Sequence, residues 1–275
     1  MTFWLALGVS VVAGLIGALS GMGGGIVLVP ALTLLGVDIK SAIPISIVSV
    51  IATSSGSAAA YVRDRMTNLK IGMFLEMFTI TGAIAGAHLS LASGQGFLFV
   101  LFGLVLLASW ATLFVRRRAE WEPANDQDAF SRWLELSGHY EDQAAHRTIS
   151  YRARHAYLGG PMMLMAGLAA GMLGIGAGAL KVMIQDLVMD LPPKVSSTTS
   201  NMIIGVTALA GAGVYLAAGQ IDPGLVAPVI IGVVTGAFVG TRLLVRMTNE
   251  SVSRLFRVVL LILGAEMVLR GMGVF

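Results

Sequence analysis

The sequence contains no cysteine and little charge. Without cysteine the chain can form neither disulfides nor thiolate metal sites. Charged residues make up 12% of the chain, against about 25% in a typical soluble domain. They are also clustered, so long apolar runs remain between them. Runs of about 18 or more apolar residues are typical of membrane spans, and we therefore expect membrane lipid to be the main solvent of this chain.

The sequence also lacks the signals of nucleotide-driven and nucleic-acid-binding proteins. Its net charge of +3 comes without a basic stripe, and lysines and arginines of cytoplasmic loops account for it. No phosphate-binding loop for ATP is present, so we expect ion or substrate gradients to supply energy. Gly174, Gly176 and Ala179 fit a dinucleotide fingerprint, but no predicted strand precedes them. We expect no cofactor, no metal and no nucleic-acid partner.

The apolar runs divide the chain into two halves, 1–115 and 157–275, joined by a polar linker, 116–156. The runs cover 2–19, 26–36, 43–62, 71–92 and 97–115, then 157–173, 179–189, 195–217, 225–245 and 252–269. The first run lacks the basic start and the cleavage site of a signal peptide, and we expect it to be a retained span. The second run of each half is too short for a full span and predicts a half-length helix.

The linker carries a short apolar pattern within its polar sequence. Phe130, Trp133, Leu134 and Leu136 predict a short amphipathic helix that lies at the membrane interface. The segment is too short to suggest a separate catalytic domain, and we interpret it as a cytoplasmic connection between the halves.

The two halves repeat each other. Gly14 and Gly25 fall on Gly167 and Gly178 at an offset of 153 residues, and after one inserted residue positions 40–89 fall on 194–243. Ordered identities with a single insertion indicate an internal repeat.

Charge in the loops predicts that the two copies are inverted. The basic segments 63–70 and 116–118 are expected in the cytoplasm, whereas 219–224, which corresponds to the first of them, has no lysine or arginine. Arg242 and Arg246 are cytoplasmic only if the short run 179–189 returns the chain across the membrane. We therefore predict ten segments, five in each half, with the N-terminus outside. An eight-span arrangement with Arg242 and Arg246 outside is the alternative.

A glycine cluster follows the first run of each half, at 21–25 and 174–178. Glycine costs a helix interior about 1 kcal/mol relative to alanine, so three glycines in five residues break the helix. A broken helix is tolerated in a bilayer only where its backbone is buried in protein or lines a wet cavity, and paired breaks point to a transporter's binding site. Helices that start at Gly25 and Gly178 would direct free N–H groups toward an anion near the midplane.

Other glycines recur at four-residue spacing. This spacing predicts close helix packing for Gly82 with Gly86, and for Gly232, Gly236 and Gly240. The latter face is also a candidate surface for a homodimer.

Polar residues within the runs are further candidates. Ser46 and the segment 196–201 could donate hydrogen bonds to an oxyanion, or bond helix carbonyls as serine and threonine commonly do in membranes. Lys181 has an apolar setting, where charge is usually functional; it either holds an anion or pairs with Gln185 or Asp186. Glu76 and His88 are candidates for proton coupling. Glu266 and Arg270, four residues apart, are expected to pair.

These motifs resemble the TauE/SafE family of sulfite and organosulfonate exporters. The resemblance lies in Gly21–Gly25, Pro30, Gly36-Val37, Lys40, Ala42 and Ser46, and in Gly174–Gly178, Lys181-Val182, Pro193-Lys194-Val195, Thr199-Ser200-Asn201 and 204–208. Ala177 stands where the family usually has a third glycine, and Pro44-Ile45-Ser46 replaces Gly-Thr-Ser. The resemblance implies a multi-pass carrier in the bacterial plasma membrane that moves small sulfur-containing anions outward.

We therefore expect an all-α integral membrane protein of two inverted repeats whose short broken helices meet near the midplane. It would be a secondary transporter and not an enzyme; an anion channel and a carrier of another small anion or a cation are the alternatives. The expected substrate-binding residues are Gly23, Gly24, Gly25, Ser46, Gly176, Gly178, Lys181, Thr199, Ser200 and Asn201.

Overall fold

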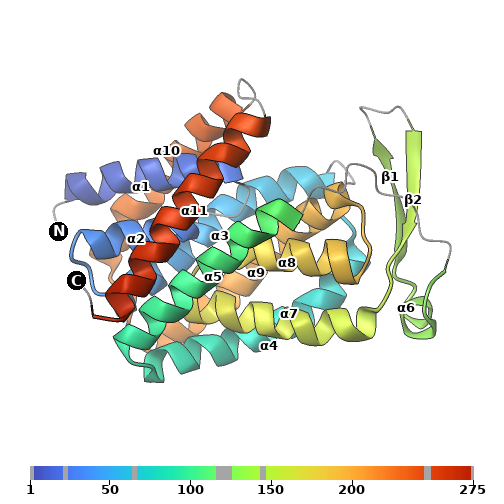
Figure 1. Cartoon of the computed structure of the whole chain (residues 1–275), viewed down its shortest axis with the longest axis horizontal. Coiled ribbons are helices and arrows are strands. Elements are labelled where there is room, and N and C mark those ends of the chain that lie inside the picture. The colour runs from blue at the N-terminus through green and yellow to red at the C-terminus, as the bar shows by residue number, and fades with distance from the viewer. Residues whose placement is uncertain are drawn as a thin grey trace.

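The computed structural model describes residues 3–20, 24–63, 67–115, 126–142, 147–244 and 249–273. The first half contains α1 (Phe3–Ser20), α2 (Gly25–Leu34), α3 (Ile39–Arg63), α4 (Leu69–Ala92) and α5 (Gln95–Val115). The linker contains α6 (Ala129–Trp133), β1 (Ser137–Asp142) and β2 (Arg147–Arg152). The second half contains α7 (Ala156–Leu173), α8 (Gly178–Met183), the π-helix η1 (Ile184–Val188), α9 (Pro193–Ala217), α10 (Pro223–Leu244) and α11 (Asn249–Gly271). Figure 1 shows their arrangement.

The helices have the length and composition of a multi-pass membrane protein. Among the described residues, four helical stretches are long and apolar enough to cross a membrane: Leu69–Ala92, Ala156–Leu173, Pro193–Ala217 and Pro223–Gly240. Shorter apolar helical stretches cover Phe3–Gly17, Gly25–Leu34, Ile39–Ser55 and Gln95–Ala111. Each predicted run thus corresponds to a helix, and the all-helical membrane class is confirmed.

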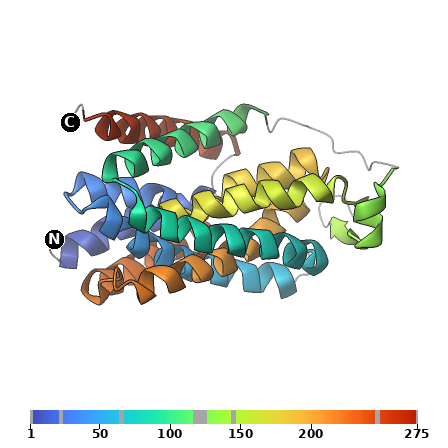
Figure 2. The same ribbon diagram turned by 90° about the horizontal axis from the view of Figure 1, so that it is seen from below.

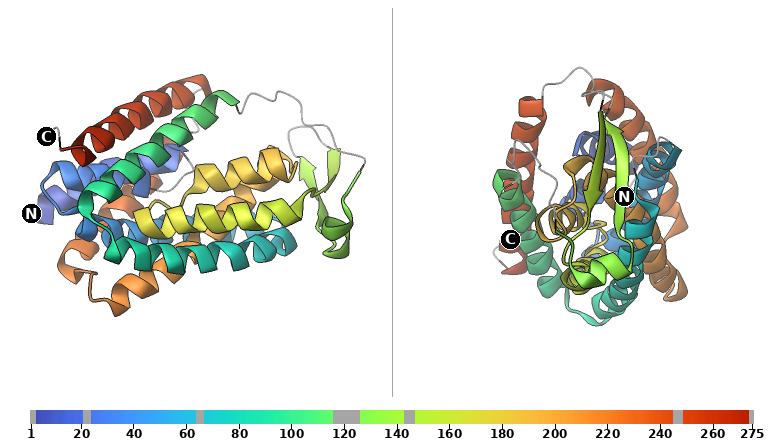
Figure 3. Two further views of the ribbon diagram at one scale, coloured as in Figure 1. Left: turned by 60° about the horizontal axis from the view of Figure 1, so that its bottom comes forward. Right: turned by 90° about the vertical axis from the view of Figure 1, so that its right-hand side faces the viewer.

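The helices form an elongated bundle in which α1 begins and α11 ends at the end opposite the β-hairpin (Figure 1). The short α2 lies beside α1 in the half of the bundle near the N-terminus, and α8 lies beside α7 in the half near the hairpin (Figures 1 and 3). Helices α5 and α11 pack together along one side (Figure 2). The two short helices thus occupy opposite halves of the bundle.

The short run 179–189 returns the chain to the end of the bundle where α7 begins. The backbone N–H of Arg154, just before α7, donates to the carbonyl of Met189 at 3.0 Å. His155 Nδ1 lies 3.3 Å from the carbonyl oxygen of Val188. This return is the one that the loop charges required for ten segments. Residues 64–66, 116–118 and Arg246, on which the charge argument also drew, lie outside the described part of the chain.

Glycine brings helices of the two halves into close contact. A Cβ at Gly82 of α4 would overlap the Leu164 carbonyl oxygen of α7, and a Cβ at Gly236 of α10 would overlap the Val11 carbonyl oxygen of α1. The prediction of close packing is therefore confirmed. The Gly232 and Gly236 face is covered by α1 of the same chain, so its suggested role as a dimer surface is wrong.

We expect Gly82→Ala to destabilise the protein by about 1–3 kcal/mol, because the added methyl group has no space against backbone. This loss outweighs the helix propensity of alanine, which favours it by about 1 kcal/mol. Gly213→Ala on α9 is the matched control, since a Cβ there meets no heavy atom within 4 Å. The measurement is the thermal unfolding midpoint in detergent, and equal midpoints for the two variants would contradict this packing.

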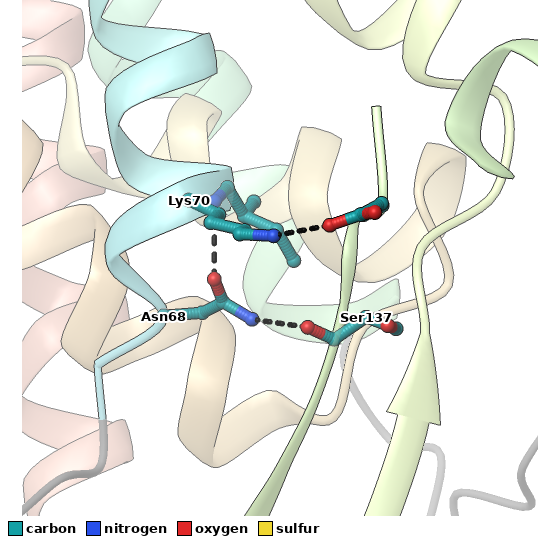
Figure 4. A network of polar contacts seen from close by, with 5 residues as sticks. Asn68, Lys70 and Ser137 are labelled. Atoms are coloured by element: carbon teal, nitrogen blue, oxygen red, sulfur yellow. Dashed lines mark hydrogen bonds and ion pairs between the residues drawn. The ribbon is translucent and has the colours of Figure 1, made fainter. Parts of the chain in front are cut away.

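The linker docks on the start of α4. Asn68 caps α4 by accepting from the Ile71 N–H at 3.1 Å, and its Nδ2 donates to the Ser137 carbonyl at 3.1 Å and to the Tyr151 hydroxyl at 2.9 Å. Lys70 forms an exposed ion pair with Glu135 at 2.6 Å, which lowers the pKa of Glu135. Figure 4 shows the Asn68–Ser137 hydrogen bond and the Lys70 ion pair. Asn68 thus joins the first half to the linker.

The linker differs in part from the predicted amphipathic helix. Among the linker residues that the structure describes, Ala129–Trp133 is the helical stretch, and residues further along form an antiparallel hairpin with Ser137 opposite Arg152. Phe130 and Trp133 are exposed, whereas Leu136 is buried. The apolar residues therefore lie in a single helical turn and in the short connection that leads into β1.

The Asp128 carboxylate fixes α6 against the start of α7. Partial burial opposes its ionisation, but hydrogen bonds from the Ser131 hydroxyl and from the N–H groups of Ser131 and His155 lower its pKa. Because the folded-state pKa is lowered, this stabilisation is present above the unfolded pKa of about 4 and is lost as the pH falls through the folded value.

At neutral pH we expect Asp128→Ala to remove about 1 kcal/mol of capping free energy and so to raise trypsin cleavage at Arg132 about fivefold. Asp222→Ala, which removes a similar local bond to the Gly224 N–H, is the control and should leave that cleavage unchanged. Cleavage at Arg132 that does not rise would show that Asp128 does not hold α6.

Candidate functional site

The two glycine breaks meet in the interior. A Cβ at Gly25, the first residue of α2, would lie 2.7 Å from the carbonyl oxygen of Gly174 and 2.7 Å from Ser46 Oγ. The Ser46 hydroxyl donates to that Gly174 carbonyl at 2.9 Å. Gly174 and Gly176 have φ of 67° and 68°, in the left-handed region that glycine adopts without strain. The chain therefore turns sharply at the second break, and this turn is in contact with the first residue of α2.

Both short helices begin at this meeting point. Helix α2 starts at Gly25 and α8 at Gly178, and neither Gly24 nor Ala177 at the N-cap position makes a side-chain cap. The first N–H groups of a helix have no partner within it, and together with the helix dipole they favour a negative charge. The starts of both helices agree with the sequence prediction.

The meeting point is closed in this structure. Gly24, Gly25 and the segment 174–178 are buried. A Cβ at Gly25 would lie 2.9 Å from the side chain of Val50. A Cβ at Gly176 would lie 3.2 Å from the side chain of Val50 and 2.8 Å from that of Ile204. Val50 of α3 thus packs against both breaks and Ile204 of α9 packs against the second.

A buried charged centre lies one turn further along α8. The Lys181 side chain is fully buried, and its Nζ donates to Thr207 Oγ1 of α9 at 2.8 Å. Thr207 Oγ1 lies 3.1 Å from Glu76 Oε1 and 3.1 Å from Thr79 Oγ1, both on α4. The hydroxyl of Thr207 therefore bridges a lysine of the second half and a glutamate of the first.

Comparison with known proteins gives the family. Residues 6–267 match the family described as "Sulfite exporter TauE/SafE". The chain belongs to the TauE/SafE family. Similar curated proteins are the probable membrane transporter proteins YunE and YdhB of Bacillus subtilis (strain 168), each 26% identical. The first match covers 98% of this chain and 99% of YunE, and the second 83% of this chain and 85% of YdhB. No solved structure matches the chain.

This TauE/SafE chain brings most of its predicted binding residues to the meeting point. Gly24, Gly25, Ser46, Gly176 and Gly178 lie there, and Ser200 Oγ lies 3.5 Å from the Gly178 carbonyl oxygen. Gly23 lies outside the described residues. Ser46 and Ser200 both face carbonyls of the second break, which is the structural role that the sequence left open.

Two other predicted binding residues lie on α9. Thr199 is buried and accepts from the Asn68 N–H at 3.3 Å, so it contacts the start of α4. Asn201 is half-buried.

The two candidates for proton coupling lie in different surroundings. Glu76 is buried beside Thr207 and Thr79. His88 is exposed and, with Ile84 and Leu91, lines a shallow apolar groove between α4 and α9. Of the two, Glu76 is the one that faces the interior of the bundle.

The structure also shows the partners of the other charged residues that the sequence singled out. Glu266 and Arg270 form the expected ion pair, at 3.2 Å. Gln185 Nε2 donates to the main-chain carbonyl of Lys181 at 3.3 Å, whereas the Lys181 ammonium turns to Thr207.

Sequence reasoning missed Thr207 and Thr79 as members of the charged centre. Thr207 matches Thr53 in the repeat, but a membrane threonine most often bonds a carbonyl one turn earlier. Thr207 does lie 2.6 Å from the Ile203 carbonyl oxygen. The only sequence signal was the presence of a lysine and a glutamate in apolar runs of opposite halves.

We expect Ser46→Ala to destabilise the protein by about 1–3 kcal/mol, because the buried Gly174 carbonyl loses its donor. Ser55→Ala is the control, since Ser55 is exposed and bonds the carbonyl of Ile51 in its own helix. Thermal unfolding midpoints in detergent should fall for the first variant only. A Ser46→Ala protein as stable as Ser55→Ala would mean that Ser46 does not support the break.

Proposed function

We propose that this protein is a secondary transporter of the bacterial plasma membrane that exports small sulfur-containing oxyanions such as sulfite and sulfonates. The observation that carries the proposal is the contact of Gly25 with the Gly174 carbonyl, which joins the two breaks at one point in the bundle. The family description, a sulfite exporter, supports the substrate class.

The two halves are proposed to be inverted copies. Gly82 of α4 packs on Leu164 and Leu168 of α7, and Gly236 of α10 packs on Val11 and Leu15 of α1. The offsets of the sequence repeat convert the first set of residues into the second. The α4–α7 contact thus corresponds to the α10–α1 contact, as expected when two repeats are related by a two-fold axis in the membrane plane.

The site is proposed to lie between the breaks. Main-chain N–H groups at the starts of α2 and α8 would donate to the oxyanion, and Lys181 would offset its charge. Ser46, Thr199, Ser200 and Asn201 would supply further donors once the anion competes with their present partners. Because Val50 and Ile204 close the breaks, we propose that one repeat rocks against the other to expose them to each side in turn.

The test is counterflow of labelled sulfite in liposomes that contain the purified protein. A carrier exchanges external label for unlabelled internal anion and saturates, whereas an anion channel shows no counterflow. Gly25→Ala should reduce the exchange at least tenfold, because its Cβ would occupy space against Gly174 and Ser46. Gly213→Ala, with open space around its Cβ, should exchange normally.

Saturable flux without counterflow would indicate an anion channel and not a carrier. Counterflow of cations but of no oxyanion would overturn the substrate class.

A further inference from the structure

We propose that Glu76, Thr207 and Lys181 form a proton-coupling centre in which Glu76 takes up one proton for each monovalent anion that the transporter binds. The inference rests on the proposed anion transport and adds the coupling ion, the stoichiometry and the residue that relays the proton.

The Thr207 hydroxyl can serve both protonation states of Glu76. It has one hydrogen and accepts a hydrogen bond from Lys181 Nζ, so it can donate to either Glu76 Oε1 or the Ile203 carbonyl. Beside a carboxylate it donates to Glu76. Beside a carboxylic acid protonated at Oε2 it still donates to Oε1, which remains an acceptor. Neither state leaves this hydroxyl unsatisfied.

Glu76 also has an oxygen available for the proton. Its Oε2 is buried and has no hydrogen-bond partner among the described residues. A buried carboxylate oxygen without a partner is unfavourable. Protonation at this oxygen forms one O–H bond with a proton taken from water and leaves the Oε1 contact with Thr207 in place.

Charge balance connects this proton to the anion. With Glu76 ionised and Lys181 protonated, the centre has no net charge, and a monovalent anion at the adjacent break would add an uncompensated negative charge. A buried charge without compensation is strongly unfavourable. One proton on Glu76 restores neutrality, and the same proton leaves with the anion on the other side.

Few other charged groups face Glu76 in the part of the chain that the structure describes. Helix α7 has no acidic, basic or histidine side chain, and its Tyr157 is exposed. On α9, Lys194 is exposed at the first turn and the Tyr215 hydroxyl bonds the Gly171 carbonyl. Asp186 lies on η1. On α4 itself Lys70 and His88 are exposed. Lys181 is the cation that interacts with Glu76.

The centre occurs once and has no counterpart related by the repeat, which sets the stoichiometry. At the repeat offsets, Lys181 corresponds to Leu28 and Glu76 to Ile230. A second copy of the charged centre is thus replaced by apolar side chains, and one proton rather than two accompanies each transport event.

The experiment uses methanesulfonate, a monoanion at every pH of the assay, in liposomes with an imposed pH gradient. Wild-type protein should accumulate it about tenfold per pH unit on the alkaline side, and a potassium diffusion potential should not change this ratio. Glu76→Gln should exchange labelled for unlabelled methanesulfonate but lose the pH-driven accumulation. Glu266→Gln removes a different carboxylate from an apolar helix and should accumulate normally.

A second pair of variants tests the relay without removing a charge. Thr207→Ser keeps the hydroxyl and should retain the tenfold accumulation, whereas Thr207→Val should lose it. If Glu76→Gln does not fold, Glu76→Gln with Lys181→Met removes both charges and should also show no accumulation.

Three results would overturn the inference. Wild-type counterflow without pH-driven accumulation rejects the coupling but leaves the proposed transport intact. Accumulation by Glu76→Gln or Thr207→Val equal to that of wild type rejects the centre. Absence of counterflow for both sulfite and methanesulfonate rejects the proposed function, and the coupling with it.

Discussion

The structure depends on satisfying main-chain polar groups inside an apolar bundle. Where α7 ends, the chain turns through residues 174–177 before α8 begins, and the carbonyls of this turn lie far from water. Ser46 supplies a donor to the Gly174 carbonyl from the other half of the molecule. The first half thus satisfies a carbonyl at the break of the second, and the two halves are in direct contact where their helices are interrupted.

Glycines act in two different ways in this bundle. Close approach of α4 to α7 and of α1 to α10 brings the two halves together along their lengths, and a side chain at Gly82 or Gly236 would separate them. Small residues at such contacts are usual between membrane helices, because packing has to replace the hydrophobic effect in lipid. The glycines at the breaks act differently, through their left-handed conformation.

Much of this arrangement could be predicted from the sequence, because backbone rules are local. Glycine clusters marked the breaks, and short runs marked the half-length helices that begin at Gly25 and Gly178. The partners of side chains could not be predicted in the same way. The sequence offered an anion, or else Gln185 or Asp186 from the same stretch of chain, as the partner of Lys181, whereas its ammonium contacts Thr207 of α9. The β-hairpin was missed because its strands are short and polar, and a dimer face was wrongly suggested because glycine spacing does not reveal which helix approaches it.

The single charged centre has a consequence for direction. A carrier that moves an anion together with a proton moves the equivalent of a neutral acid, so the electrical potential neither helps nor hinders it. In a cell whose interior is one pH unit more alkaline than its surroundings, net outflow would begin only once the internal anion exceeds the external one about tenfold. Below that ratio the same carrier would bring the anion inward, so export would depend on an internal excess of the anion.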